Sequence, residues 1–203
     1  PYLKGLNVKD HVEPGSTAFG IKSLVEDHEI DMIVMGSSGV TGLEEIVIGS
    51  NTEKVVRHSE VPVLVVKNEI KDINIKNAVF ASNFKPENVD AFKKAKKVAN
   101  SFNADMQMLY VNLPGNQFSS TTEIHEQMRS FLKKVEVPLD KKNIEIFNDY
   151  TIQEGVLNGS EHLKADLIII PTHGRKGLSH FFNGSIGEDV VNHSELPVLT
   201  LKI

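Results

Sequence analysis

The sequence predicts an α/β fold: a doubly wound, mainly parallel five-stranded sheet, present as a tandem repeat whose first copy is incomplete. Residues 12–67 match residues 147–202 without a gap at an offset of 135 residues, and the block 36–67 is identical to the block 171–202 at about half of its positions. Along the second copy, predicted strands and helices alternate, which is typical of parallel sheets with right-handed crossovers. The predicted strands are also short and apolar, like strands that are buried on both faces.

The second copy begins with a short apolar strand predicted over residues 78–82. Apolar residues then recur at helical spacing over 86–102, with lysines on the opposite side, which predicts an amphipathic helix. Residues 104–112 read as a mostly buried strand, and residues 113–122 are rich in Pro, Gly, Asn and Ser, as loops are. A second helix is predicted over 122–135.

The same copy continues with three more strands, two helices and a glycine-rich loop. In order, these are a strand over 142–148, a helix over 151–163, a wholly apolar strand over 166–170, the loop to Asn183, a helix over 185–193 and a strand over 197–201. Strand and helix therefore alternate five times, as a complete doubly wound domain requires.

The first copy keeps only the last part of this pattern. Its predicted elements are a strand near 6–12, a helix over 16–28, a strand over 31–35, a helix from Ser50 and a strand over 62–66. The counterparts of the first two strands and helices are absent. Because the first strand of a doubly wound sheet is central, its loss separates the third strand from the fourth. We therefore expect either that the polypeptide extends upstream of Pro1, which is not an initiator Met, or that another chain completes the half-domain.

These patterns predict the domain boundaries. Residues 1–67 form the C-terminal half of a first domain, and residues 77–203 form a complete second domain. Between them, residues 68–76 are charged and lack an apolar period, which is typical of a linker.

The composition excludes several classes of function. The formal net charge is -5, so neither nucleic acid nor an anionic membrane is expected as the main partner. The chain contains no cysteine, which excludes disulfides, thiolate nucleophiles and cysteine-based metal sites. Its longest apolar runs are far shorter than the ~20 residues that span a bilayer, and its first residues lack a signal-peptide pattern. A cytoplasmic protein is expected by default.

A glycine-rich loop carries the chemistry in both copies. It follows a buried strand and ends at a helix N-terminus, where unbonded backbone N–H groups and the helix dipole favour an anion. The loop is neither a Walker A sequence nor the dinucleotide-binding G-x-G-x-x-G. A role in turn formation and helix capping alone remains the alternative. The pattern is Gly36-x-x-Gly39, nine residues, Gly49-Ser50 in the first copy, and Pro171-x-x-Gly174, nine residues, Gly184-Ser185 in the second.

The loop spacing, the preceding strands IDMIVMGSSG and ADLIIIPTHGRKG, and the following S-E-x-P-V-L resemble the universal stress protein family, in two tandem copies. The resemblance implies an adenine nucleotide alpha hydrolase-like fold and a cytoplasmic stress-response regulator that acts through dimerisation and binding to an unidentified protein partner. It also implies that the fifth strands of the two units pair antiparallel, so that residues 62–66 should lie beside residues 197–201. A homo-oligomer is expected as well.

In members of this family that bind ATP, the nucleotide lies on the glycine loop, beside an Asp after the first strand and a main-chain segment of the second strand. The resemblance therefore implies a site for ATP or another adenine nucleotide, with Mg²⁺ only when the nucleotide is bound. Two departures are Asn83, which replaces the Asp, and Pro171, which replaces the first Gly and removes one N–H. The residues that the resemblance assigns are Asn83, Val111, Thr172, His173, Gly174, Gly184, Ser185 and Ile186 in the second copy, and Gly36, Gly39, Gly49 and Ser50 in the first.

Catalysis has little support in the sequence. The eight histidines form no metal-binding spacing, and no Ser-His-Asp order or G-x-S-x-G motif is present. We expect no catalytic residue and no metal site. Two alternatives remain open: an interaction module of the same fold that binds no nucleotide, and a slow ATP hydrolase, for which no general base is evident.

Overall fold

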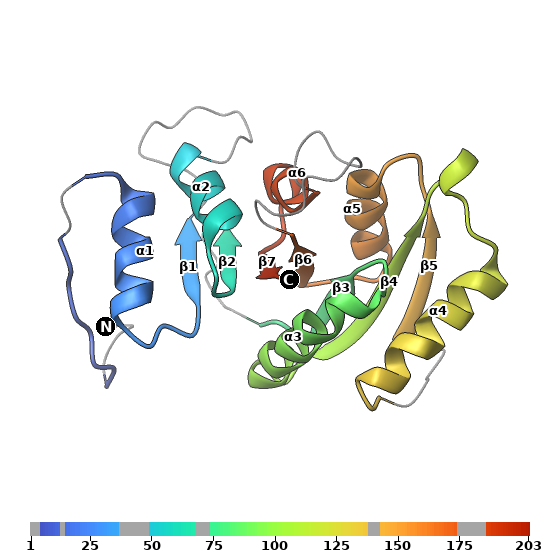
Figure 1. Cartoon of the computed structure of the whole chain (residues 1–203), viewed down its shortest axis with the longest axis horizontal. Coiled ribbons are helices and arrows are strands. Elements are labelled where there is room, and N and C mark those ends of the chain that lie inside the picture. Colours follow the sequence, from blue (N-terminus) through green and yellow to red (C-terminus); the bar gives the residue numbers. More distant parts are fainter. Residues whose placement is uncertain (1–4, 13–14, 37–48, 68–73, 138–142, 174–185) are drawn as a thin grey trace.

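The computed structural model describes residues 5–12, 15–36, 49–67, 74–137, 143–173 and 186–203 (Figure 1). Within these residues the chain forms one seven-stranded sheet to which both copies contribute. Five of the strands belong to the second copy: β3 (Asn77–Ala81), β4 (Asp105–Asn112), β5 (Ile144–Asn148), β6 (Leu167–Thr172) and β7 (Val198–Lys202).

The five strands of the second copy lie in the order β7-β6-β3-β4-β5, and every neighbouring pair is parallel. The chain runs outward from β3 to β5, then returns to the other side of β3 and continues to β7. This confirms the predicted doubly wound topology, in which the direction of winding reverses beside β3.

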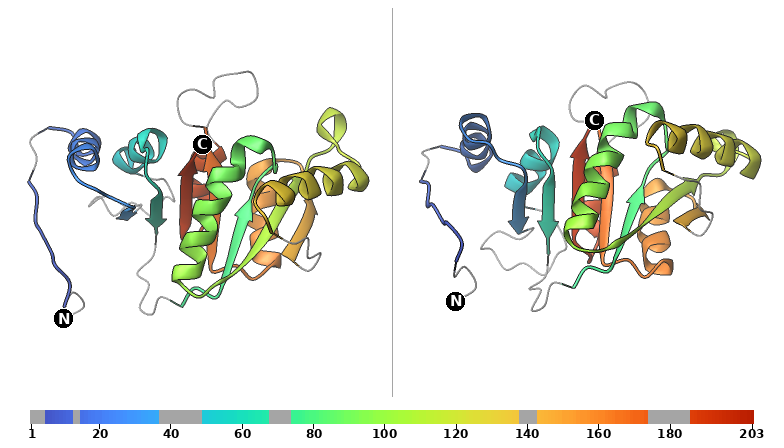
Figure 2. Two further views of the ribbon diagram at one scale, coloured as in Figure 1. Left: turned by 60° about the horizontal axis from the view of Figure 1, so that its bottom comes forward. Right: turned by 90° about the horizontal axis from the view of Figure 1, so that it is seen from below.

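Helices cover both faces of this sheet (Figure 2). Two of them, α3 and α4, pack on one face together with a short 3-10 turn, whereas α5 and α6 pack on the other. Their bounds are η1 (Pro86–Asn88), α3 (Val89–Ser101), α4 (Thr121–Lys134), α5 (Ile152–His162) and α6 (Ile186–His193), with a second 3-10 turn, η2 (Gly115–Gln117), before α4.

Side-chain caps fix where two of these helices begin. At α4, the Ser120 hydroxyl accepts a bond from the backbone N–H of Glu123 at 3.3 Å, and the Glu123 carboxylate accepts one from the Ser120 N–H at 2.7 Å. At α5, the Thr151 hydroxyl accepts a bond from the Glu154 N–H at 3.1 Å. Each cap satisfies donors that the helix itself leaves unbonded.

The core has two layers because successive residues of a strand point to opposite faces. Along β3, Phe80 belongs to the layer under α3 and α4, and Val79 belongs to the layer under α5 and α6. Phe80 and Phe131 both meet Phe92 edge to face, with ring centroids 5.3 and 5.4 Å apart respectively. Phe131 also contacts Phe84, which is buried directly after β3. This aromatic cluster supports the loop that leaves the central strand.

The first copy contributes two strands and two helices, which are α1 (Thr17–Asp27), β1 (Ile33–Gly36), α2 (Ser50–His58) and β2 (Val63–Val66). The strand β1 pairs parallel with β2, and Ile33 lies opposite Val63. In the second copy, Ile168 lies opposite Val198, which is the same register at the offset of 135 residues. The repeat seen in the sequence is therefore a repeat of structure.

The two copies join through antiparallel pairing of β2 with β7, as the family resemblance implied. Leu64 pairs with Leu199, its own counterpart in the repeat, while Val63 pairs with Thr200 and Val65 with Val198. A local two-fold axis therefore passes between Leu64 and Leu199. The two sheets become one, with a single antiparallel junction.

The strand predicted near residues 6–12 is wrong, since residues 5–12 contain no strand. The offset of 135 residues makes residues 9–13 the counterpart of β5, which pairs with β4. Among the described residues no counterpart of β4 lies in the first copy, so this segment has no strand there to bond with, and a strand needs one. Its apolar side chains Leu6, Val8 and Val12 are exposed by 65%, 53% and 96%.

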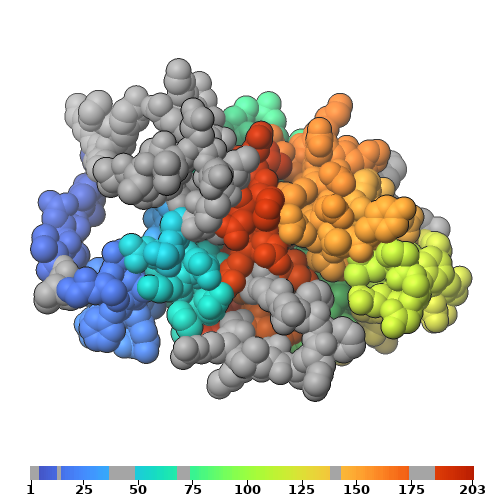
Figure 3. Space-filling model, turned by 90° about the horizontal axis from the view of Figure 1, so that it is seen from above, coloured from blue at the N-terminus to red at the C-terminus, as the bar shows by residue number. Residues whose placement is uncertain are grey.

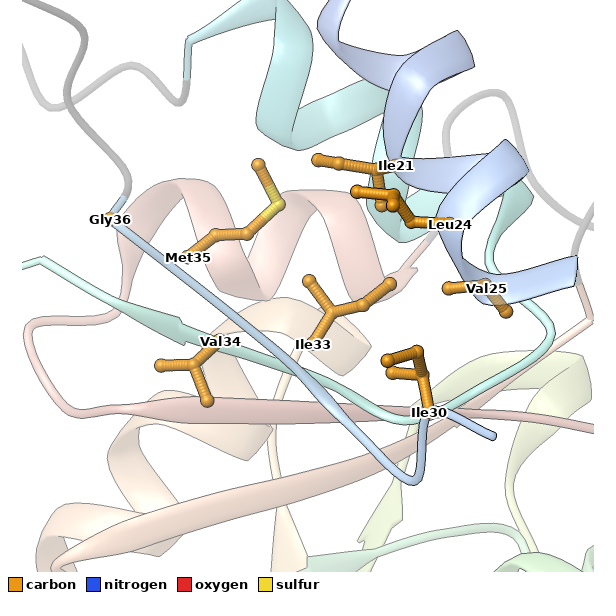
Figure 4. A pocket seen from close by; sticks show the side chains of 8 residues that line it. All are labelled: Ile21, Leu24, Val25, Ile30, Ile33, Val34, Met35 and Gly36. Carbon is orange, nitrogen blue, oxygen red and sulfur yellow. The ribbon is translucent and has the colours of Figure 1, made fainter. Parts of the chain in front are cut away.

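One edge of β1 is also without a neighbouring strand in the described part of the chain. The equivalent edge of β6 carries β3. Between α1 and this open edge lies an apolar cavity of about 380 Å³, shown in Figure 4. Its lining consists of Ile21, Leu24, Val25, Ile30, Ile33, Val34, Met35 and Gly36.

The predicted limits of the two domains and of the linker stay predictions. Of the linker 68–76, the structure describes only residues 74–76. The backbone N–H groups of Lys76 and Asn77 both donate to the carboxylate of Asp166, at 2.9 Å each, which ties the start of β3 to the start of β6.

We expect Gly155→Ala to destabilise the protein, because α5 lies very close to β4 at this point. A Cβ at Gly155 would lie 2.3 Å from Cγ1 of Val111, far inside contact distance. Overpacking of this kind costs about 1–3 kcal/mol, more than the gain in helix propensity from alanine. Urea denaturation should show the loss.

Gly36→Ala is the matched control, because no atom lies within 4 Å of its added Cβ. The double variant Gly155→Ala/Val111→Ala should recover stability. An unchanged denaturation midpoint for Gly155→Ala would contradict this packing.

We expect Asp189→Asn to stabilise the protein at pH 7 but not at pH 3. Burial raises the pKa of Asp189, and the charge of neighbouring Glu188 raises it further, against the opposing effect of His193. The folded state therefore binds the proton more tightly than the unfolded state, so stability falls as the pH rises from the unfolded pKa through the folded one. Urea denaturation at both pH values checks this, with the exposed Asp90→Asn as control. An equal effect at pH 3 and pH 7 would contradict the charge explanation.

Candidate functional site

The carboxyl ends of β3, β4 and β6 meet at one edge of the sheet, where the winding reverses between β3 and β6. Ligands of open α/β sheets bind at such a switch point. Asn83 follows β3, Asn112 ends β4 and Thr172 ends β6. Polar residues at or just after the ends of the three central strands therefore lie together at this edge.

Asn83 shapes the turn after β3. Its side-chain oxygen accepts bonds from the Lys85 N–H at 3.1 Å and from the Asn88 amide at 2.7 Å. The Gln127 amide on α4 donates to the Asn83 backbone oxygen. The residue itself is exposed, and the next one, Phe84, takes a left-handed backbone conformation with φ of 50°. The Asn83 carboxamide therefore lies at this edge of the sheet, and its oxygen already accepts hydrogen bonds from within the protein.

Val111 lies near the carboxyl end of β4. Its side chain points toward α5, where it would clash with any Cβ on Gly155. It lies opposite Phe147 in the parallel ladder of β4 and β5. A ligand beside this position would meet backbone atoms and an apolar wall.

Asn112 is a buried polar residue that sequence reasoning missed. Its amide donates to the Asn148 side-chain oxygen at 3.1 Å, and its own side-chain oxygen accepts the Ser119 N–H at 3.0 Å. These bonds hold the loop before α4 against the ends of β4 and β5. The signal that could have revealed it is an Asn directly after a run of strand residues, at the carboxyl end where sites form.

The end of β6 is tied to the turn after β3. The Thr172 backbone oxygen accepts a bond from the Ile203 N–H at 2.9 Å, and its side chain is buried. His173, the next residue, lies with Nε2 3.2 Å from the Glu87 carboxylate on η1, and both side chains are about half exposed. Glu87 was also missed in the sequence, where nothing distinguishes it from other surface acids. The contact brings His173 and the Asn83 turn to the same side of the edge.

The glycine loops themselves lie mostly outside the described residues. This holds for Gly39 in the first copy and for Gly174, Gly184 and Ser185 in the second. Ile186 is described: it begins α6 and packs partly buried against the core layer under α5 and α6. The chain therefore enters the glycine loop of the second copy after β6 and leaves it at the start of α6.

In the first copy, three predicted residues can be placed. Gly36 ends β1, and its carbonyl accepts a bond from the Thr52 hydroxyl at 3.1 Å. Gly49 is the N-cap of α2, and Ser50 is its first helical residue. Glycine at the N-cap offers no side-chain hydrogen bond to the first turn of this helix. Ser50 lies one position too far into the helix for its hydroxyl to serve as the N-cap.

The chemistry available at the edge is hydrogen bonding by carboxamides and backbone groups. Among the described residues, no group of three or more His, Asp or Glu side chains is arranged to hold a metal ion. Glu87, a carboxylate in the 3-10 turn that follows Asn83, contacts His173. Nor does any helix of the described chain combine the length and apolar character needed to cross a membrane.

Comparison with known proteins identifies both copies. The model of the "Universal stress protein family" matches residues 2–67 and 74–202. A universal stress protein of Methanocaldococcus jannaschii is 48% identical over 63 residues, which are 31% of this chain and 39% of that protein. Universal stress protein G of Shigella flexneri is 37% identical over 60 residues, which are 30% of this chain and 42% of that protein.

Solved structures show the same fold. A universal stress protein from Archaeoglobus fulgidus superposes with a TM-score of 0.69 at 22% identity, covering 91% of this chain and 66% of that one. A putative universal stress protein from Pseudomonas aeruginosa gives 0.68 at 18% identity, covering 89% and 66%.

The chain therefore spans about two fifths of its curated relatives, 39% of the first of them, and 66% of these longer structures. The family model covers both segments of the repeat, and the repeat forms one sheet whose units share their strand register. On these grounds the chain belongs to the universal stress protein family.

Proposed function

We propose that this chain is a stress-response regulatory protein that binds ATP or another adenine nucleotide in its second copy. The observation that carries the proposal is the meeting of Asn83, Val111 and Thr172 at the switch point beside β3, at the start of the loop that leads to α6. Anions are favoured where a glycine-rich loop enters a helix N-terminus.

Each part of the nucleotide has a matching group at this edge. The Asn83 carboxamide can donate to a ribose hydroxyl, although it adds no negative charge. The main chain at Val111 and the apolar wall beside it suit a purine base. The backbone N–H groups of the loop from Gly174 to Ser185 would receive the phosphates, and Mg²⁺ would be held through phosphate oxygens, since the described residues offer no ligand cluster.

The first copy is not expected to bind nucleotide, although its loop has more glycines. Gly36, Gly39, Gly49 and Ser50 remain candidates only for a phosphate, because the described chain has no counterparts of β3 and β4 beside β1. Among the described residues nothing beside β1 would hold a ribose or a base, so we expect one nucleotide for each chain of this sequence.

The regulatory mechanism that fits this site is a population shift. Nucleotide on the second loop would favour one arrangement of the loop and of the surface near α6, and a protein partner would read that surface. A cytoplasmic location and a homo-oligomeric state belong to the same proposal.

One observation favours a different function, that of an interaction module without nucleotide. The side-chain oxygens of Asn83 and Asn112 both accept hydrogen bonds within the protein, so these residues also have a structural role. A slow ATP hydrolase has less support, because Glu87, a carboxylate in the turn after Asn83, is in contact with His173 and a general base must be available to the attacking water.

We expect calorimetric titration with ATP or AMP to show one site per chain. Gly184→Val should abolish binding, because its side chain would block the approach of a phosphate to the loop. Gly49→Val, the equivalent change in the first copy, should leave the affinity unchanged. Asn83→Ala should weaken binding by about tenfold, which is the value of one lost hydrogen bond at roughly 1.4 kcal/mol.

Three outcomes decide among the candidates. Absence of heat at millimolar nucleotide would overturn the binding proposal and leave the interaction module. Equal loss of binding in Gly49→Val and Gly184→Val would place the site elsewhere. Release of phosphate from bound ATP, absent in Gly184→Val, would establish the hydrolase.

A further inference from the structure

The junction between the copies is nearly symmetric, and its helices α2 and α6 lie side by side on one face of the sheet (Figure 3). Their buried residues are the same in both copies, since Val55 and Val56 correspond to Val190 and Val191 at the offset of 135 residues. A symmetric junction of this kind offers three pairings: first copy with second, second with second, and first with first.

Each copy carries the same lysine and glutamate at the junction, Lys67 and Glu60 in the first copy and Lys202 and Glu195 in the second. The Lys202 ammonium bonds the Glu60 carboxylate. Lys67 donates to the backbone oxygen of Asn192. Because each copy carries both the Lys and the Glu, these contacts are available in any of the three pairings, so they cannot distinguish them.

One contact breaks the symmetry. Arg57 of α2 donates through Nε and Nη2 to the two carboxylate oxygens of Glu188 on α6, at 2.7 Å each. It also bonds Glu53, the counterpart of Glu188, at 2.9 Å within its own helix. In the second copy, however, the counterpart of Arg57 is Asn192, which carries no charge.

The two members of this contact differ in burial. The Glu188 side chain is only 8% exposed, whereas Arg57 is 44% exposed. A buried carboxylate depends on its cation, since the interior does not replace the water that the charge has lost. In a pairing of two second copies, each Glu188 would face the neutral amide of Asn192. In a pairing of two first copies, each Arg57 would face Glu53 and the charges would match.

We infer that the pair Arg57–Glu188 makes the α6–β7 face of the second copy selective for a unit with arginine at the position of residue 57. The face therefore accepts the first copy of this chain and rejects another second copy. An interface can exclude a wrong partner by leaving a charge unpaired in the wrong complex. This selectivity is independent of nucleotide binding.

The first experiment measures hydrogen exchange of the junction in the full chain. Arg57→Asn gives the first copy the residue of the second, and we expect the amides of β2 and β7 to exchange about tenfold faster or more. Arg57→Asn/Glu188→Gln should restore most of the protection, because no buried charge then remains. Lys202→Gln, which removes a charge from the contact with Glu60, should have the smaller effect. If Arg57→Asn changes exchange no more than Lys202→Gln does, the inference is wrong.

The second experiment tests rejection of the wrong pairing by sedimentation. Leu64→Asp places a charge at the local two-fold axis and releases the first copy, while amides of β3 and β4 report whether the second copy remains folded. We expect Leu64→Asp to self-associate no more than the native chain, and Leu64→Asp/Glu188→Gln to associate about tenfold more tightly. Leu64→Asp/Glu195→Gln is the control of equal charge. Equal association of all three variants would overturn the inference.

Discussion

The antiparallel pairing of β2 with β7 is the contact on which the arrangement of the whole chain depends. Two parallel strands and two helices are too little to bury both faces of a sheet, and isolated two-stranded units are marginal in water. In this chain β2 gains a second neighbour only from β7. On the side of the junction, the two strands of the first copy thus continue into β7. The other edge of β1 pairs with no strand of the described chain.

The same constraint distinguishes the surroundings of β1 and β6, the strands that precede the two glycine loops in the sequence. Both strands pair in the same register with the strand after them. In the described chain, β6 ends beside a switch point because β3 is its other neighbour, whereas β1 has no such neighbour. The local sequence of a loop supplies backbone donors, but the strands across the edge decide whether a whole ligand can be held. For the first copy, membership of the family suggests a nucleotide site, whereas the described strands beside β1 do not complete one.

Much of this arrangement could be predicted from the sequence. The elements of the second copy and the repeat follow from apolar periodicity and from the gapless match, because register in a buried sheet is fixed by the side-chain pattern. The junction was implied by the resemblance to the universal stress protein family. The strand near 6–12 could not be predicted correctly, since its apolar pattern indicates a strand whether or not a neighbour exists. That Gly49 rather than Ser50 is the N-cap of α2 could not be read from the sequence either, because helix ends are uncertain by one or two residues there. The bonds of Asn112 and the pair of Arg57 with Glu188 join residues far apart in sequence, so they required the fold.

The dependence of β2 on β7 also bears on the order of events during synthesis. A ribosome makes β2 well before β7, and at about 5–20 residues per second the interval is on the order of ten seconds. During that time β2 lacks the antiparallel neighbour that it has in the folded chain. The junction between the two copies can therefore form only near the end of synthesis, after β7 has left the ribosome.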